Sequence, residues 1–558
     1  MKQIRKILVA NRGEISVRVI RTAKEMGIAT VAVYSDADRG ALHVELADEA
    51  YPLGPASPAA SYLNIDKLIE CARASGAGAV HPGYGFLAEN GEFARRVVAE
   101  SLVWIGPHAD AIDAMGDKLH ARSAMRAAGV PVVPGALRPI SDVAEARRAA
   151  EQFGLPLALK ATAGGGGRGL KVAQSLDEIA SAYDTARREA EAYFKNGTLY
   201  AERYLQNPKH IELQLIADKH GNVVHAGERD CSLQRRHQKL WEETPAKIPD
   251  AVRSAMREAG VRAAKAIGYD SVGTMECLVS GDAFYFLEMN TRIQVEHTVT
   301  EMVTGLDLVR EQIRIAAGEP LGYAQTDIAF RGAAIEVRVN AEDPAQAFRP
   351  APGTITAYRE PGGPGIRIDS AAYAGWAIPP EYDSLVAKLV VWAPAREAAI
   401  ARLRRAIDEY VADGVPTTLP LLRDLCDFGS VIDATYGTAT LETFAQAWKP
   451  SARDGVVKRA LPATAARAQR RTAPRLGSLG RIGSGGGGDT VRSPMHGIIV
   501  ELRVAGGDRV VEGQVVAVIE AMKMMNEIRA HRAGRVGAVL VGAGSNVERG
   551  AALVTIDG

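Results

Sequence analysis

The stretch LEMNTRIQVE, residues 287–296, decides how the largest part of this chain folds. Its even positions are all polar, and its odd positions are mostly apolar. A β-strand directs successive side chains to opposite faces of its sheet. Alternation alone would also suit a half-exposed strand whose polar face meets water. We expect here one polar surface, lined by Glu288, Asn290, Arg292, Gln294 and Glu296.

The strand expected just before it, Thr274–Val279, adds another carboxylate to that surface. With a three-residue loop at Gly281–Ala283, Glu276 would lie directly opposite Glu288. Facing carboxylates repel each other unless a cation lies between them. Together with Asn290 they form a hard-oxygen site suited to Mg²⁺ bound to nucleotide phosphates.

Phosphate-binding features lie on both sides of the molecule's centre in sequence. Leu155–Leu159 is expected to be a buried strand that ends at Lys160, and the glycine run 164–167 and Arg168 follow it. Glycines allow close backbone approach to phosphate oxygens, although a glycine run is often a plain flexible loop. The segment QRRHQK, residues 234–239, concentrates basic side chains as a polyanion site requires.

The N-terminal segment alternates strands with helices. Lys6–Ala10 and Ala29–Val33 are expected to be buried strands, joined by a helix at Ile15–Met26, and GAVHPG (78–83) and LVWIGP (102–107) continue the pattern. This order predicts a parallel sheet covered by helices. The first turn lacks G-x-G-x-x-G, so we do not expect a dinucleotide site there.

The C-terminal part contains a tether and a duplicated module. The segment 448–489 is rich in Ala, Arg, Pro and Gly and is expected to be a flexible linker, with an end-to-end distance of roughly 35 Å. The segment 497–520 recurs at 534–557, at a constant offset of 37 residues. Short apolar strands with Gly turns, repeated once, predict a small two-fold β-sandwich. Between the repeats, Lys523 in EAMKMM is expected at an exposed hairpin tip.

These motifs resemble those of a known family. The region from Lys2 to about Phe444 is similar to the biotin carboxylase member of the ATP-grasp superfamily, on the basis of VANRGEI, HPGYGFLAEN, IGP, MGDK, GGGGRG, RDCSLQRRHQK, EMNTRIQVEH and EVRVNAEDP. SPMHG and EAMKM resemble the biotin carboxyl carrier domain. Lipoyl domains usually place Asp before their lysine, so Met522 favours biotin. Carbamoyl-phosphate synthetases share the grasp fold but lack this carrier.

The resemblance implies a role for each matching residue. ATP would be bound by Lys118, Lys160, Glu202, Leu205, His210, Gln234 and His237, with Gly166 and Gly167 in a mobile flap. Mg²⁺ or Mn²⁺ would be held by Glu276, Glu288 and Asn290. Bicarbonate would be positioned by Lys239, Arg292 and Val295. Glu296 would be its base, Arg338 would stabilise the biotin enolate, and Lys523 would carry the biotin. Three departures from the family pattern are Thr162, Ala163 and Thr298.

The expected architecture is an α/β and α+β multidomain enzyme. Its parts are an N-terminal parallel-sheet domain (1–117), an ATP-grasp domain (118–330, flap about 131–203), a C-terminal mixed domain (331–447), the linker (448–489) and an all-β biotinyl domain (490–558). In such an enzyme bicarbonate attacks the γ-phosphate of MgATP, and the carboxyphosphate formed supplies CO₂ to biotin.

The resemblance also implies partners. We expect the α-subunit of an acetyl- or propionyl-CoA carboxylase, with a separate carboxyltransferase β-subunit, a biotin protein ligase that modifies Lys523, and homo-oligomers within a larger complex. A subunit of a pyruvate or other oxo-acid carboxylase is the alternative in this class. A carrier scaffold with an inactive ATPase segment, or an ATP-grasp ligase without biotin, are hypotheses from other classes.

Composition limits the remaining possibilities. The formal net charge is +1, so no global field favours nucleic acid as a partner. The four cysteines are scattered and form no C-x-x-C pair, which is typical of a reducing compartment. We expect no signal peptide and no membrane helix, and we predict a cytoplasmic protein.

Overall fold

The computed structural model describes residues 3–162, 169–450, 490–522 and 524–557 of the chain. Gly166, Gly167, Lys523 and residues 451–489 of the expected linker therefore lie outside the described residues. The chain divides into two compact units, Met1–Trp448 and Lys449–Gly558, which are described separately below as the catalytic unit and the carrier unit.

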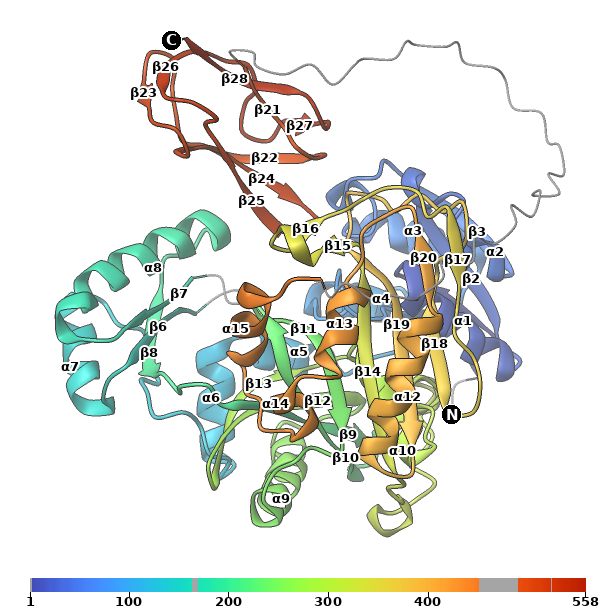
Figure 1. Ribbon diagram of the computed structural model, residues 1–558. Coiled ribbons are helices and arrows are strands. Elements are labelled where there is room, and N and C mark those ends of the chain that lie inside the picture. The colour runs from blue at the N-terminus through green and yellow to red at the C-terminus, as the bar shows by residue number, and fades with distance from the viewer. Residues whose placement is uncertain (1–2, 163–168, 451–489, 523, 558) are drawn as a thin grey trace, which may run out of the picture. The chain divides into compact units, whose positions relative to one another are not determined.

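A five-stranded sheet opens the catalytic unit (Figure 1). Its pairs are all parallel, and its spatial order is β3 (Glu49–Gly54), β2 (Ala29–Ser35), β1 (Lys6–Val9), β4 (Ala79–His81) and β5 (Val103–Trp104). Ile7 and Val9 pack on one face with residues of α1 (Gly13–Glu25). Leu8 packs on the other face with residues of α3 (Ile65–Ser75) and α4 (Gly91–Ala99). The expected parallel, helix-covered sheet is confirmed.

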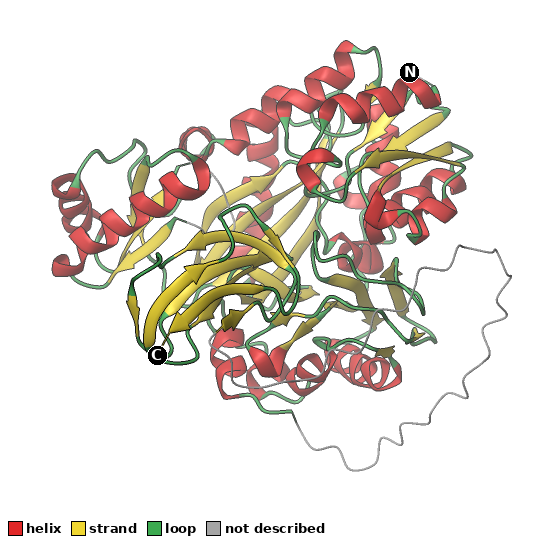
Figure 2. Ribbon diagram, turned by 90° about the horizontal axis from the view of Figure 1, so that it is seen from above, coloured by secondary structure: helices red, strands yellow, loops and turns green. Residues whose placement is uncertain are grey.

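An eight-stranded antiparallel sheet forms the centre of the same unit (Figure 2). Its spatial order is β13 (Ala283–Asn290), β12 (Val272–Ser280), β9 (Lys209–Ala217), β10 (Val223–Arg235), β11 (Gln238–Thr244), β14 (Ala333–Asn340), β19 (Leu385–Ala393) and β18 (Ile366–Ser370). β11 pairs with β14, so the sheet runs without a break across the boundary at residue 330 that we had expected between domains. Helix α9 (Asp250–Ala266) covers β9 and β12 through Met256, Ala259 and Ala263.

Other helices surround this sheet in the described part of the catalytic unit. Those before the sheet are α2 (Leu42–Leu46), α5 (Ala109–Gly116) and α6 (Lys118–Ala127). Those after it begins are α10 (His297–Thr304), α11 (Leu308–Ala316), α12 (Arg396–Glu409), α13 (Leu419–Leu425), α14 (Gly429–Ile432) and α15 (Thr440–Ala447). Helix α10 matters most for the site, because it begins directly after Glu296 and packs along β14.

A smaller lobe lies between α6 and the central sheet in sequence. Its three strands are β7 (Leu170–Ala173), β6 (Leu157–Ala161) and β8 (Leu199–Arg203), and its helices are α7 (Val143–Phe153) and α8 (Ile179–Phe194). The lobe has its own apolar core, which includes Leu157, Leu159 and Ala186. Lys160 lies on β6, and the glycine run that follows connects β6 to β7. This lobe corresponds to the expected flap.

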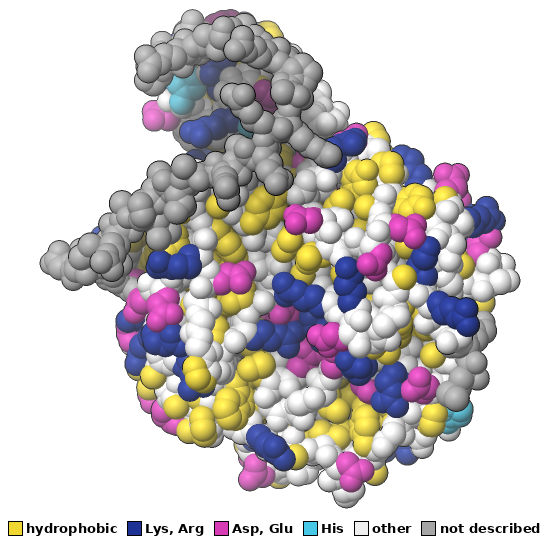
Figure 3. Space-filling model, turned by 90° about the vertical axis from the view of Figure 1, so that its right-hand side faces the viewer, with side chains coloured by type: hydrophobic (Ala, Val, Ile, Leu, Met, Phe, Trp, Pro, Cys, Tyr) yellow, Lys and Arg dark blue, Asp and Glu magenta, His cyan; other side chains and the backbone are white. Residues whose placement is uncertain are grey.

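The surface and the cysteines agree with the composition. On the face drawn in Figure 3, basic and acidic side chains of the catalytic unit are interspersed. All four cysteines are buried and free. Within the described part of the chain, every helix is too short or too polar to cross a bilayer.

The carrier unit confirms the predicted duplication. One sheet has the order β21 (Thr490–Arg492), β28 (Ala552–Asp557), β26 (Gly534–Val539) and β23 (Arg509–Val510). The other has the order β25 (Met524–Arg529), β24 (Val515–Ala521), β22 (Gly497–Leu502) and β27 (Asn546–Val547). Each half contributes one short strand to the sheet of the other half. The two halves therefore share one core, which neither could bury alone.

Two glycines at equivalent positions permit the closest strand contacts in this unit. A Cβ on Gly497 would lie 2.5 Å from the carbonyl oxygen of Glu520 and 2.5 Å from Ile519 Cγ2. A Cβ on Gly534 would lie 2.4 Å from the carbonyl oxygen of Asp557 and 2.5 Å from Ile556 Cγ2. The backbone of the neighbouring strand thus occupies the same space in both repeats.

We expect Gly497→Ala and Gly534→Ala each to lower the free energy of unfolding of the carrier unit by about 1–3 kcal/mol, because backbone must shift to admit the methyl group. Gly506→Ala is the matched control, since its Cβ would meet nothing nearer than 3.6 Å and Ala543 stands at the equivalent position. Native-state hydrogen exchange of the full-length protein measures these changes. Equal protection in all three variants would contradict the close-contact argument.

Candidate active site

The hairpin of β12 and β13 brings Glu276 and Glu288 opposite each other, as predicted. The route to this pairing differs from the expected one. The turn has two residues rather than three, because Ser280 pairs with Ala283, and a bulge at Leu287 restores the offset. The bulge also changes which side chains face the core, from Phe286 before it to Met289 after it. Glu288 and Asn290 are thereby turned towards the site.

The strand itself is shorter than expected, and this corrects our interpretation of residues 287–296. β13 ends at Asn290, so Arg292 and Gln294 lie in a loop and Glu296 immediately precedes α10. The reason is competition for backbone groups. The N–H of Thr291 donates to Glu89 at 3.1 Å, and the carbonyl of Gly273 accepts from Gln214 at 2.9 Å. Neither group is left to extend the ladder.

Lys239 lies at the centre of the polar cluster. Its Nζ is 2.6 Å from Glu212, 3.0 Å from Glu276 and 2.6 Å from Glu296. These carboxylates come from β9, from β12 and from the residue before α10. Burial lowers the pKa of the Lys239 ammonium, but the three carboxylates outweigh it and raise the pKa well above its usual value. Lys239 is therefore a fixed positive charge.

Arg338 is a second fixed cation beside the same base. Its guanidinium donates to Glu242 at 2.7 Å and to Glu296 at 2.9 Å. Burial raises the pKa of the Glu296 carboxyl, but Lys239 and Arg338 hold it well below its usual range. Burial raises the pKa of Glu242 to about 7, although Arg338 opposes the shift. Glu296 is thus the ionised member of the pair.

One departure from the family pattern has a visible contact. The hydroxyl of Thr298 donates to the carboxylate of Glu336, which is fully buried on β14. Burial raises the pKa of Glu336 well above its usual value, and Lys388 and Arg338 oppose that rise. A proline at position 298 would have no side-chain donor, so this threonine adds a hydrogen bond to a buried acid.

The residues predicted to hold a metal ion fit that task. Both oxygens of Glu276 already accept protein donors, including Asn290 at 2.9 Å and His210 at 3.0 Å. Glu288, by contrast, has no hydrogen bond or ion pair with any described residue. Burial and the neighbouring charge of Glu276 raise the pKa of Glu288. A divalent cation would relieve this repulsion, and two carboxylates with an amide are ligands that Mg²⁺ prefers.

A cavity of about 310 Å³ adjoins this carboxylate pair. Glu89, Lys118, Glu288, Asn290 and Arg292 contribute to its wall. Two other groups of possible ligand atoms, His210–Glu212–Glu276 and Glu212–Cys231–Glu296, each lie within 4.8 Å of one another. Both depend on Glu212, whose carboxylate oxygens are bonded to Arg229 and Lys239. A cation there would meet two fixed positive charges.

The predicted nucleotide residues surround a common space in part. Lys160 forms an ion pair with Glu202, which also accepts from Arg122 at 2.5 Å. His210 Nδ1 lies 3.4 Å from Gln234 Nε2. The pKa of His237 is lowered by burial and by the charges of Lys160 and His210. The predicted set also includes Lys118, at the start of α6, and the half-buried Leu205.

Local backbone conformation explains how His237 is presented. β10 and β11 are joined by the two-residue turn Arg236-His237, and both residues have positive φ, +47° and +65°. Such a turn matches the twist of a hairpin, although it is strained without glycine. The sequence identified these residues only as a basic cluster. The turn separates them, so that Gln234 and Lys239 pair across the strands.

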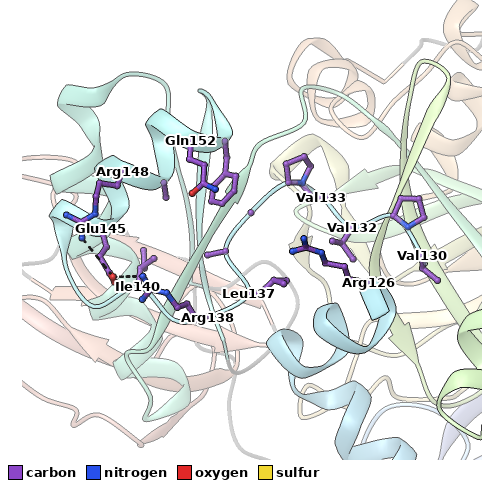
Figure 4. A pocket seen from close by; sticks show the side chains of 16 residues that line it. Arg126, Val130, Val132, Val133, Leu137, Arg138, Ile140, Glu145, Arg148 and Gln152 are labelled. Carbon is purple, nitrogen blue, oxygen red and sulfur yellow. Dashed lines mark hydrogen bonds and ion pairs between the residues drawn. The ribbon is translucent and has the colours of Figure 1, made fainter. Parts of the chain in front are cut away.

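A groove of about 850 Å³ lies where the flap joins the rest of the catalytic unit (Figure 4). The strap 130–140 runs along it, with Arg126 on one side and α7 on the other. Arg122 donates to the carbonyl of Val133 in this strap at 2.6 Å, and the same guanidinium donates to Glu202. The strap and the Lys160 ion pair are therefore coupled through one arginine.

Several polar residues of the site were missed from the sequence. Arg229 is fully buried and donates to five acceptors: Glu212, Gln214, Thr274, Gln294 and Thr300. Glu212 and Gln214 could have been found, because HIELQL in β9 alternates as strictly as the stretch that was recognised. Glu89 and Glu242 carry no comparable signal, since long-range packing alone brings them to the site.

Comparison with known proteins agrees with this geometry. Family models match residues 3–112 ("Biotin carboxylase, N-terminal domain"), 117–324 ("Carbamoyl-phosphate synthase L chain, ATP binding domain"), 336–443 ("Biotin carboxylase C-terminal domain") and 489–556 ("Biotin-requiring enzyme").

Individual relatives match over the catalytic unit. Biotin carboxylase 1 of Bacillus subtilis is 49% identical over 444 residues, which is 79% of this chain and 99% of that protein. The small subunit of 2-oxoglutarate carboxylase from Hydrogenobacter thermophilus is 51% identical over 441 residues, 78% of this chain and 93% of that protein. One pyruvate carboxylase subunit, from Methanothermobacter thermautotrophicus, is 52% identical over 416 residues, 74% of this chain and 85% of that protein.

A solved structure gives the same result. The biotin carboxylase domain of 2-oxoglutarate carboxylase from Hydrogenobacter thermophilus, a dimer in complex with MgADP, ADP and bicarbonate, is 50% identical with a TM-score of 0.77, over 80% of this chain and 98% of that one. The duplicated carrier unit lies in the segment that matches biotin-requiring enzymes. The chain therefore belongs to the biotin carboxylase family of ATP-grasp ligases.

Proposed function

We propose that the chain uses MgATP and bicarbonate to carboxylate a biotin carried on its own Lys523. The observation that supports this most directly is the arrangement of Lys239, Arg292 and Arg338 around the ionised Glu296. Bicarbonate is a poor nucleophile until it loses its proton, and fixed cations lower the free energy of the resulting dianion. Three cations beside one base suit that step.

Glu296 is the base in this proposal. In the unliganded arrangement its pKa is depressed, because Lys239 and Arg338 both bind its oxygens. A bound anion would compete for the same two cations. As they turn to the anion, the proton affinity of Glu296 rises, so the carboxylate gains basicity when substrate is present. Arg292 and the backbone of Val295 would hold the bicarbonate beside it.

The remaining residues position the other substrates. Lys118, Lys160, Glu202, Leu205, His210, Gln234 and His237 are proposed to bind ATP, together with Gly166 and Gly167 outside the described residues. Glu276, Glu288 and Asn290 are proposed to hold Mg²⁺ or Mn²⁺, which would neutralise charge on the transferred phosphoryl group. Such transfers depend on positioning and charge neutralisation more than on covalent help. Arg338 is proposed to meet the biotin, which supplies the nitrogen that accepts the carboxyl group.

The carrier unit fits the proposed biotin attachment. β24 and β25 pair up to Ala521 and Met524, so Met522 and Lys523 connect the two strands. Lys523 itself lies outside the described residues. A linker of about 40 residues would give the carrier a long reach and a high local concentration.

The acceptor of the carboxyl group is proposed to be acetyl- or propionyl-CoA, bound by a separate carboxyltransferase β-subunit. The four family matches run from residue 3 to residue 556, and the widest interval between them, 443 to 489, is smaller than a domain. A pyruvate or other oxo-acid carboxylase is the second candidate, because relatives with those names match as well.

The half-reaction is tested with protein co-expressed with a biotin ligase. Biotinylated wild type, incubated with MgATP and labelled bicarbonate and then separated rapidly at alkaline pH, is expected to retain label, and Lys523→Arg is expected to retain none. Absence of label on biotinylated wild type that binds ATP would instead favour a carrier scaffold without catalysis.

The metal site is tested with Glu288→Gln. Because Glu288 has no described protein partner, we expect the metal-free Tm of this variant to equal or exceed that of wild type. We expect the Mg²⁺ concentration for half-maximal activity, at fixed ATP, to rise at least about tenfold. Glu276→Gln is the comparison, since it also loses contacts to Lys239 and His210 and should lower Tm. An unchanged Mg²⁺ requirement in Glu288→Gln contradicts the assignment.

The acceptor is tested by adding purified carboxyltransferase subunits. With an acyl-CoA carboxylase β-subunit, we expect acid-stable label to appear in malonyl- or methylmalonyl-CoA, and we expect this subunit to be recovered in pull-downs. Transfer to pyruvate or 2-oxoglutarate by the corresponding carboxyltransferases, without transfer to acyl-CoA, would establish the second candidate.

A further inference from the structure

A lysine that the proposed mechanism does not use lies in the interior of the catalytic unit. Lys388 is fully buried, in the otherwise apolar strand LVAKLVVWA (Leu385–Ala393). An unpaired ammonium in such a place would cost several kcal/mol or lose its proton. Burial indeed lowers the pKa of Lys388, but the nearby carboxylates of Glu14, Asp369 and Glu336 outweigh this effect and raise it. The charge is therefore retained.

The ammonium of Lys388 joins three distant parts of the chain. Its Nζ lies 3.2 Å from Glu14 on α1 and 3.6 Å from Asp369 on β18. It also donates to the backbone carbonyl of Val295 at 3.0 Å. Val295 is the residue before Glu296, in the loop between β13 and α10. Of these contacts, only the last one touches the proposed bicarbonate site.

The partners of Lys388 are themselves fixed. Glu14 accepts a hydrogen bond from the phenol of Tyr84. Asp369 accepts two from Arg367, each at 2.8 Å. Arg367 also donates to Glu301 on α10 at 2.6 Å. The carbonyl of Val295 is thus tied to the N-terminal sheet domain and to the end of the central sheet through rigid, buried contacts.

The loop needs such support because it has little of its own. Residues 291–296 belong to no strand or helix, since the ladder stops at Asn290. The end near Arg292 is held by Glu89, at 2.8 Å from Nε. At the other end, the Glu296 side chain is bound only through cations that substrate would also engage. Lys388 supplies a backbone contact that does not depend on substrate.

Packing alone does not explain a lysine at this position. An apolar residue of similar length in an apolar strand would avoid the desolvation of an ammonium and of its carboxylates. The register places Lys388 between Asp369 and Arg338 on neighbouring strands, yet the described contacts of Arg338 go to Glu242 and Glu296. The contact that distinguishes Lys388 from an ordinary buried ion pair is the one to Val295.

We propose that Lys388 is a positioning residue, which fixes the Val295 carbonyl and thereby aims the Val295 N–H and the Glu296 carboxylate at bicarbonate. The inference rests on the proposed function of this loop. A displacement of about 1 Å in a reacting group lowers rates by about 10²-fold. Loss of the Lys388 contact should therefore weaken bicarbonate use and leave nucleotide binding intact.

The test must separate positioning from stability. Lys388→Met leaves Glu14 and Asp369 without their cation and should lower Tm sharply. The double variant Lys388→Met/Glu14→Gln removes one buried negative charge as well, keeps an acceptor for Tyr84, and should recover much of the Tm. Glu14→Gln alone is the matched control, because it disturbs the ion pair but preserves the bond from Lys388 to Val295.

The readout is bicarbonate-dependent ADP formation by the full-length, biotinylated protein. For the double variant we expect the KM for bicarbonate to rise at least about tenfold, with the KM for ATP within about twofold of wild type. Hydrogen exchange of the peptide covering residues 291–298 should be correspondingly faster. Glu14→Gln should keep the wild-type KM for bicarbonate and the wild-type exchange rate of that peptide.

Each result bears on one claim. A double variant with recovered Tm and unchanged KM for bicarbonate overturns the positioning role and leaves Lys388 as a structural ion pair. An increase of equal size in Glu14→Gln overturns it too, because the Val295 contact would then be irrelevant. If wild type itself forms ADP without any dependence on bicarbonate, the proposed function fails instead, and hydrogen exchange of 291–298 still decides whether Lys388 holds the loop.

Discussion

The balance of charge around Lys239 is the constraint on which the catalytic unit depends. Its ammonium contacts carboxylates from two strands and from the residue before α10, so these elements can meet in the interior only with the cation present. Breaking a buried pair by removing one partner leaves an uncompensated charge, which costs about 3–5 kcal/mol. The interior is therefore organised by charge as much as by apolar packing. Arg229 repeats the principle one layer further in, with all of its described contacts to buried or site residues.

This arrangement also explains why one carboxylate differs from the rest. Glu212, Glu276 and Glu296 are neutralised by cations of the protein, but Glu288 has no described partner and faces Glu276. A protein could lower this repulsion with one more lysine. Leaving it unrelieved gives the site affinity for an external divalent cation, as the repulsion disappears when the ion binds. The same logic applies to Glu296, whose cations are available to an anionic substrate.

The carrier unit is held together by a different constraint. Its core is small, and each sheet includes a short strand from the opposite half. At Gly497 and Gly534 the neighbouring backbone occupies the place of a side chain, so the contact distance between strands is set twice by the same means. Duplication of one sequence therefore produces a closed module whose symmetry is visible at single residues.

The sequence by itself determined the parts whose cause is local. Alternation of polar and apolar residues located β12 and β13, the 37-residue repeat specified the carrier fold, and motif spacing identified Lys239, Glu276 and Glu288. Tertiary structure decided the rest. The end of β13 at Asn290 follows from a hydrogen bond to Glu89, some two hundred residues away, and the continuity of the sheet past residue 330 follows from pairing of β11 with β14. Lys388 looked like an isolated polar residue in an apolar strand until Glu14, Asp369 and Val295 were brought around it. Periodicity reports which face of an element is buried, but the identity of the groups that meet across a buried face depends on contacts distant in sequence, which no local pattern records.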